Sequence, residues 1–314
     1  MLMMIFKITV KILIIKLRIK IMKERKYKTL NIGKKKIHIH FLTIVGSSLH
    51  GLKTKESDLD IKGVFVWGKE ELNGLEDVTE TLSHKNTLKS DWSDLMKQIN
   101  NEFNLNLEDN DDLDLFEAKK FMKTTLKNDF NMFDMIFSKL KPIFITDEFK
   151  KTLDKKEYFI DMKKANQRFN GMSNSCVINF KKLGRLSERT AKQDKDLLKN
   201  MAKSLQFLFS LKNLFESGTF NTNLYKEQQK EVLSIKNGNK SQKEVEKRHK
   251  ELQEEVEDIY LSDKNRLDKF ISNRIVINKL LVELNLNSVI PEKINNKRIN
   301  KSKVVSPENI MQMD

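Results

Sequence analysis

Residues 46–66 read GSSLHGLKTKESDLDIKGVFV, and this segment decides the predicted fold. Before it, residues 37–45 (IHIHFLTIV) form a β-branched, apolar run, which predicts a strand that ends in a tight turn at Gly46. Residues 58–67 (DLDIKGVFVW) first alternate between polar and apolar and then become fully apolar. That pattern predicts a second strand, solvated at its start and buried at its end.

The glycine turn between the two predicted strands has the chemistry of an anion site. Gly46 lets backbone N–H groups approach an anion closely, and the hydroxyl of Ser47 adds a further donor. We therefore predict that Gly46 and Ser47 bind a phosphate group. His50 lies in the same turn, and the sequence leaves open whether it contacts the bound ligand.

Two carboxylates follow the turn at a spacing that suits a divalent cation. Asp58 and Asp60 are two residues apart on a predicted strand, so their side chains share one face. Carboxylate oxygens are hard ligands, which favours Mg²⁺ or Mn²⁺. Lys62 shares this face and either contacts a phosphate or forms a salt bridge with the aspartates.

A third carboxylate is expected from a neighbouring strand. Residues 112–116 (DLDLF) follow an acidic, Asn-rich loop and predict a short strand, with a helix after it at about 117–127. Asp112 and Asp114 fall on the same face of this strand. The sequence does not choose between them, so both are candidate catalytic residues and candidate metal ligands.

The second half of the chain has helical spacing of its apolar residues. One predicted helix contains Leu197 to Phe215 and ends at Gly218. Another begins at Ser241, which forms a capping-box pattern with Glu244, and a last helix follows Asp263. The predicted fold class is α+β: a small mixed sheet with flanking helices, followed by a mostly helical region. The predicted divisions are an extension (1–21), a catalytic domain (22–150), a helical domain (151–284) and a loose polar tail (285–314).

Composition agrees with a globular protein that has a polyanionic partner. The 314 residues are 39% apolar and 33% charged, with a formal charge of +15 and a pI near 9.5. Lysines and arginines release counterions when they neutralise phosphates, although solvated surface lysines give the same totals. The single cysteine, Cys176, excludes an internal disulfide and predicts a reducing, cytoplasmic setting.

The first 21 residues are apolar but carry a cation every few positions. No uncharged stretch in them approaches the length of a membrane span, so we predict no transmembrane segment. A signal peptide has its positive charges clustered before an apolar run, whereas the charges here are spread along the segment. The segment is either an interfacial strand or helix, or an upstream extension with Met22 as the functional start.

At residues 46–66 the chain resembles the RNA-repair-pathway branch of the DNA polymerase beta superfamily nucleotidyltransferases. The shared signature is GS-x-x-x-G-L-x-T-x-x-SD-x-D-x-x-GVFV, and the similarity continues at 117–137, 197–218 and 234–246. The resemblance implies a minimal nucleotidyltransferase fold and Mg²⁺-dependent transfer of a nucleoside monophosphate from an NTP to an acceptor hydroxyl, such as an RNA end. It also implies that Gly46 and Ser47 bind the phosphates, while Asp58, Asp60 and one of Asp112 or Asp114 hold metal.

An alternative is a non-catalytic nucleic-acid-binding or regulatory module that keeps this fold. It is suggested by Lys203 and Gln206, which stand where relatives tend to carry histidine and arginine, and by FNGM at 169–172, where they tend to show Phe-x-Gly-Tyr. The intact Gly46 turn and aspartate pair favour the enzyme.

Several other residues are weighed against plain structural roles. His38 and His40 are predicted to pack within their strand, and Cys176 has no evident base partner for nucleophilic chemistry. A basic helical stretch is compatible either with a nucleic-acid backbone or with a solvated face. Its members are Lys163, Lys164, Arg168, Lys181, Lys182, Arg185 and Arg189.

Overall fold

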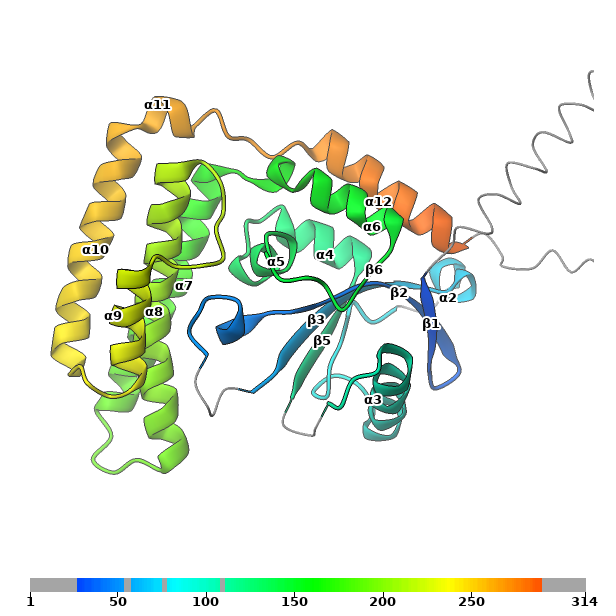
Figure 1. The fold of residues 1–314 in the computed structure, drawn as a ribbon, viewed down its shortest axis with the longest axis horizontal. Helices are drawn as coiled ribbons and strands as arrows, with labels where there is room; N and C mark the ends of the chain where they lie inside the picture. Colours follow the sequence, from blue (N-terminus) through cyan, green and yellow to red (C-terminus); the bar gives the residue numbers. More distant parts are fainter. Residues whose placement is uncertain (1–26, 54–57, 75–77, 108–110, 290–314) are drawn as a thin grey trace, which may run out of the picture. The chain divides into compact units, whose positions relative to one another are not determined.

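A mixed β-sheet occupies the N-terminal half of the chain, and helices fill the rest (Figure 1). The structure is a computed structural model and describes residues 27–53, 58–74, 78–107 and 111–289. The predicted extension (1–21) and most of the predicted tail (285–314) lie outside the described residues. Residues Lys26–Ser288 form one compact unit.

The described strands form one six-stranded sheet in the order β1-β2-β3-β5-β4, with β6 paired to β2. Their bounds are β1 (Lys28–Ile32), β2 (Lys35–Ile44), β3 (Asp60–Trp67), β4 (Thr81–Leu82), β5 (Asp112–Glu117) and β6 (Phe144–Ile145). Pairing is antiparallel except between β3 and β5, which run parallel. The predicted α+β class is therefore confirmed, and three predicted strands correspond to β2, β3 and β5.

Helices cover both faces of the sheet and then continue as a separate layer. Those near the sheet are α2 (Lys69–Asn73), α3 (Lys89–Phe103), α4 (Ala118–Thr125), α5 (Phe130–Ile136) and α6 (Asp147–Asp154). The later ones are α7 (Met162–Gly184), α8 (Ala191–Ser217), α9 (Lys226–Lys236), α10 (Gln242–Ser262), α11 (Lys264–Leu267) and α12 (Arg274–Val289). In Figure 1, α3 lies on one side of the sheet and α4 and α5 lie on the other.

The alternation of side chains along β3 and β5 produces two separate cores. Ile61 and Phe65 of β3 pack with Leu95 and Ile99 of α3. Val64 and Val66 point to the opposite face, where they join a larger cluster that reaches through α4 and α5 into the helical layer. Because alternate residues share a face, Asp60 and Lys62 lie on the same side of the sheet as this larger cluster.

Two helix boundaries agree with their predicted signals. Gly218 follows α8 in the left-handed conformation, with φ of +76°, and its N–H binds the carbonyl of Leu214. Ser241 and Glu244 form the predicted reciprocal capping box at the start of α10. Both boundaries are decided by local chemistry, which a sequence displays directly.

The predicted single helix after Asp263 is wrong, because the chain leaves the helix between α11 and α12. There the carbonyl of Phe270 accepts from Met162 N, and Asn273 N donates to the carbonyl of Tyr158. The side chain of Asn273 then accepts from Val276 N and starts the next helix. Hydrogen bonds to a distant segment thus replace helical ones. The larger core also continues past residue 150, and the division into two domains there stays a prediction.

Among the described residues, no helix has the combination of length and apolar character that a membrane crossing needs.

Candidate active site

The parallel strands β3 and β5 begin side by side, and their first residues are acidic. Asp60 lies opposite Asp112, and two residues further along Lys62 lies opposite Asp114. All four side chains share one sheet face and line the same pocket. Asp58 also lines it but precedes β3, so the predicted strand begins two residues too early.

The predicted phosphate turn lies directly against Asp60. Gly46–Ser48 form one turn of 3₁₀-helix, and Val45 N donates to the carbonyl of Asp60 across 3.0 Å. Gly46 has φ of +74°, and a Cβ at this position would lie 2.0 Å from Asp60 Oδ2. Glycine is therefore required here both for the backbone conformation and for the space that the carboxylate occupies.

Charge is concentrated around Asp60. Burial raises the pKa of Asp60, as does the negative charge of Asp112, while Lys62, Lys199 and Lys203 oppose the rise. Of the two candidates on β5, Asp112 is thus the direct neighbour of Asp60, whereas Asp114 is paired in register with Lys62. Adjacent carboxylates repel one another until a cation arrives, which makes this corner of the sheet receptive to positive charge.

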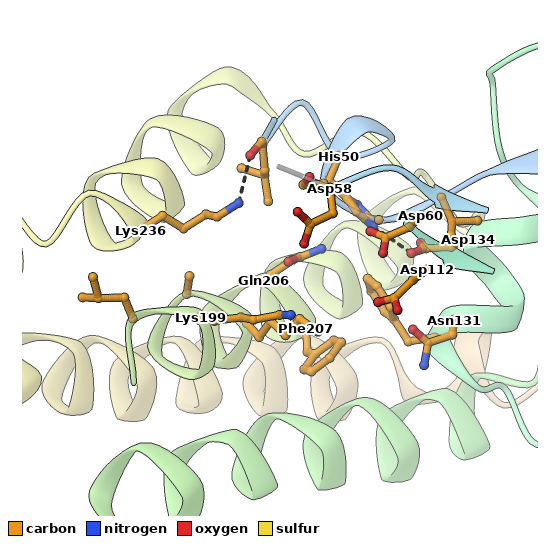
Figure 2. Close-up of a pocket in the computed structure, with 18 of the residues that line it drawn as sticks. His50, Asp58, Asp60, Asp112, Asn131, Asp134, Lys199, Gln206, Phe207 and Lys236 are labelled. Atoms are coloured by element: carbon orange, nitrogen blue, oxygen red, sulfur yellow. Dashed lines mark hydrogen bonds and ion pairs between the residues drawn. The ribbon is translucent and has the colours of Figure 1, made fainter. Parts of the chain in front are cut away.

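The opposite wall of the pocket is basic. The cavity has a volume of about 610 Å³, and α8 contributes Lys195, Lys199 and Lys203 to it at intervals of four residues. Figure 2 shows Lys199 reaching from α8 toward the side of the pocket that carries the aspartates. Lys236, at the end of α9, completes this wall and donates to the carbonyl of Leu52 across 3.0 Å.

These lysines have not been neutralised by neighbouring acids. Within the part of the chain that the structure describes, Lys195, Lys199 and Lys203 form no salt bridge with a carboxylate. Burial lowers the pKa of Lys203, and the charges of Lys199 and Lys62 lower it further. Lys203 lines the cavity, but the protein around it removes enough water to lower its pKa. A cluster of cations that repel one another around an open space has the charge that suits a polyanion.

Sequence reasoning missed most of this basic wall. Lys203 was singled out, but Lys195, Lys199 and Lys236 were not. The available signal was the four-residue spacing of lysines along α8, beside the apolar residues Leu198 and Ala202 that also line the pocket.

His50, which the sequence left open, is buried at the pocket wall. Its Nδ1–H donates to the carbonyl of Thr222 across 2.5 Å, and its Nε2–H donates to Asp134 Oδ2 across 2.9 Å. Burial acts to lower the pKa of His50, but the charge and hydrogen bond of Asp134 and the carbonyl of Thr222 together raise it. Both partners are acceptors, so this position favours the imidazolium form of His50, which ties the turn to α5 and to the segment after α8.

His38, His40 and Cys176 lie outside the pocket, and their surroundings indicate structural roles. His40 is fully buried, and its Nδ1 lies 3.1 Å from Thr146 Oγ1. Burial, followed by the charge of His38, lowers the pKa of His40 to about 3, so it is neutral. His38 lies 3.0 Å from Thr29 Oγ1, across the β1–β2 hairpin. Burial also raises the pKa of the Cys176 thiol, which disfavours the reactive thiolate.

The predicted basic stretch is partly neutralised within the fold. Four of its seven members form ion pairs with described acids: Lys164 with Asp161, Arg168 with Asp129, Lys181 with Glu246, and Arg189 with Asp194. These pairs favour the structural reading for those four residues. The other three members, Lys163, Lys182 and Arg185, form no ion pair with the described acids and do not line the pocket, so their role stays open.

Comparison with known protein families finds one that matches most of the chain. The model of one family, described as RlaP, RNA repair pathway DNA polymerase beta family, matches residues 22–283. The chain belongs to this family. No curated protein matches the chain significantly.

The carboxylates of the pocket fit a divalent cation that is also held by a substrate. Among the described residues, no three Asp, Glu, His or Cys side chains are grouped closely enough to enclose an ion by themselves. Mg²⁺ is usually held by one or two carboxylates together with the phosphates of a substrate. Asp60 and Asp112 in register, with Asp58 on the same pocket, are a donor set of that kind.

Proposed function

We propose that this chain is a Mg²⁺-dependent nucleotidyltransferase that transfers a nucleoside monophosphate from an NTP to an acceptor hydroxyl, with an RNA end as the acceptor. Family membership supports the reaction class. The observation that carries the proposal is the pocket itself, in which carboxylates at the start of two parallel strands face helix lysines that form no ion pair with the described acids.

The basic wall suits the triphosphate. Lys199 and Lys203 lie one helical turn apart, so they present ammonium groups in a row along α8. In this arrangement they bind the β- and γ-phosphates and stabilise the charge that develops on pyrophosphate as it leaves. Fixed cations in a partly enclosed pocket stabilise such charge far more effectively than water does.

The acidic wall suits a cation. Asp60 and Asp112, with Asp58 on the same pocket, would hold Mg²⁺ or Mn²⁺ together with the phosphates of the NTP, and the bound ion would polarise the α-phosphate and neutralise charge during in-line displacement. We assign the third position to Asp112 rather than Asp114, since Asp112 lies beside Asp60.

The turn at Gly46 orients the nucleotide between the two walls. Backbone N–H groups of this turn and the Ser47 hydroxyl donate to phosphate oxygens, and Gly46 keeps the turn close to Asp60. Lys62, on the same face as Asp60, contacts the phosphates from the floor of the pocket. The acceptor is inferred from the role in RNA repair that the name of the family states and from the charge of +15. The cytoplasmic location stays a prediction from the lone cysteine.

The test is to incubate purified protein and Mg²⁺ with each labelled NTP, with and without RNA. Label is expected to move to RNA, and the transfer should disappear when Mg²⁺ is chelated. RNA binding without transfer of label from any NTP would contradict the proposal and support the non-catalytic alternative. Label transferred to the protein itself would show that the acceptor is a protein side chain, and the proposal of an RNA acceptor would then be wrong.

A further inference from the structure

One carboxylate in the pocket has an oxygen without a hydrogen-bond partner among the described residues. Asp134 belongs to α5, and its side chain is only 6% exposed. Its Oδ2 accepts from His50, as described above, but its Oδ1 is buried without a hydrogen-bond partner. Leaving a buried acceptor unpaired costs stability, so such groups call for an explanation outside the folded chain.

The position of this oxygen points to a ligand. Asp134 lines the same cavity as the metal and phosphate residues. His50 holds the carboxylate in one orientation, since its own ring is fixed between Oδ2 and the carbonyl of Thr222. The second oxygen is thereby held without a partner in a side chain that lines the cavity, where part of a substrate would supply the missing donor.

Other residues that line the cavity suit a planar heterocycle. Asn131 and Gln206 also line the cavity, and their side-chain amides form no hydrogen bond with the described residues. Each amide offers one donor group and one acceptor. The rings of Phe130 and Phe207 belong to the same wall and contact each other edge to face, with centroids 4.8 Å apart. Aromatic side chains and amides are typical of the surroundings of a nucleobase.

We propose that Asp134 is a specificity-determining residue, whose free oxygen accepts a hydrogen bond from the exocyclic amino group of the nucleobase of the NTP. The inference rests on the proposed function and names its substrate class. Adenine and cytosine carry an amino group where hypoxanthine and uracil carry a carbonyl. A carbonyl facing the Asp134 carboxylate would place two acceptors together, so ATP and CTP are preferred over ITP and UTP.

The test compares these two pairs of nucleotides in binding and in transfer. One hydrogen bond to a charged group corresponds to a preference of about tenfold or more for ATP over ITP, or for CTP over UTP. Asp134→Leu has nearly the shape of aspartate but no acceptor, and it should bring the ratio close to one. An Asp134→Leu protein that keeps the full preference would overturn the proposal, as would a wild-type protein without any preference.

Asp134→Asn guards against a variant that merely loosens the fold. Without the carboxylate, buried His50 becomes neutral, keeps its Nδ1–H on Thr222, and accepts from the new amide through Nε2. The amide oxygen is then left toward the substrate, so a reduced but clear preference for amino-bearing bases should remain. If Asp134→Asn abolishes the preference as fully as Asp134→Leu does, Asp134 does not act as an acceptor. Asp129→Asn is the matched control, because Asp129 caps the same helix outside the cavity lining, and its ratio should equal that of wild type.

Two further arms separate other outcomes. If Asp134→Leu changes discrimination against 2′-deoxy or 3′-deoxy NTPs instead of the base ratio, the carboxylate reads the sugar, and the base assignment is wrong. If wild-type protein binds and transfers no NTP at all, the proposed function fails first. Transfer that is intact but indifferent to every Asp134 variant sinks this inference alone.

Discussion

At the scale of single residues, Asp60 carries the largest share of the proposed chemistry. It lies between the Gly46 turn, Asp112 and the lysines of α8, so each part of the pocket acts on its charge. The surrounding pattern of like charges on the sheet and opposite charges across the cavity is what separates this aspartate from the many that serve only in turns.

Asp60→Asn should reduce nucleotidyl transfer by at least about a hundredfold while the fold remains, because the change removes a cation ligand but preserves side-chain shape. Relief of repulsion with Asp112 leaves the free protein as stable as wild type or slightly more so. The rise in melting temperature that Mg²⁺ and NTP produce together should shrink. Transfer rates and melting curves measure both effects, and an Asn variant with wild-type activity would disprove the role of Asp60.

Gly46→Ala should destabilise the protein by about 1–3 kcal/mol through the strained positive φ and also abolish transfer, because the new methyl group displaces the Asp60 carboxylate. The control is Gly171→Ala in α7, where a Cβ meets no atom within 4 Å. That change should be neutral or stabilising by about 0.5–1 kcal/mol, as expected for alanine in a helix. Denaturant unfolding distinguishes them, and equal effects at both positions would contradict this account of the turn.

The residues of the motif could be predicted, whereas most of the rest of the pocket could not. Gly46, Asp58 and Asp60 lie within one short segment, so a turn signal and a period of two place them together. Asp134 and Lys236 come from distant parts of the chain and meet the turn only through tertiary packing. Gln206 left a faint signal, since it is a polar residue inside the apolar run of α8.

At the scale of elements, α8 has two functions on different faces. Leu205, Leu208 and Leu211 are fully buried in the larger core. On its pocket side the same helix presents Lys195, Lys199 and Lys203. The apolar period alone predicted the helix, but it did not show what its flank would face. The β1–β2 hairpin illustrates the same limit. The sequence predicts β2 from its run of apolar residues, but it does not predict the more polar β1.

Lys199→Gln and Lys203→Gln should each weaken NTP binding by about tenfold, because each removes a charge-assisted contact to phosphate. The difference from wild type should diminish as salt screens the remaining lysines. Lys192→Gln is the matched control on the same helix, since Lys192 does not line the cavity. Titration at two salt concentrations tests this, and three variants with equal affinities would remove the argument for a basic wall.

At the scale of the whole molecule, one continuous core joins the sheet to the helical layer, and buried histidines make its stability depend on pH. Burial and the charge of His38 lower the pKa of His40 from 6.5 to about 3. In the unfolded chain His40 therefore binds a proton near pH 6.5, whereas in the folded chain it stays neutral. The free energy of unfolding decreases as the pH falls below 6.5. His50 behaves oppositely, because its pKa is raised from 6.5: its contribution is complete below that pH and is lost as the pH rises through the folded value.

The free energy of unfolding should therefore respond differently in two variants. Relative to His40→Asn, the wild type should lose stability as the pH falls below about 6, at up to about 1.4 kcal/mol per pH unit. Relative to His50→Asn, it should lose stability as the pH rises above about 7. Denaturant unfolding across a pH series measures both differences, and slopes of the same sign would contradict the assignments.

The contact between Gly46 and Asp60 has an evolutionary consequence. The carboxylate occupies the volume that a side chain at position 46 would fill, so mutations at the two sites are not independently available to selection. Any larger residue in the turn demands a shorter one on the strand, and a shorter one is no longer an acid. Among descendants of this sequence, the glycine and the aspartate should persist together or disappear together, and a lineage that has exchanged the glycine has given up the chemistry as well.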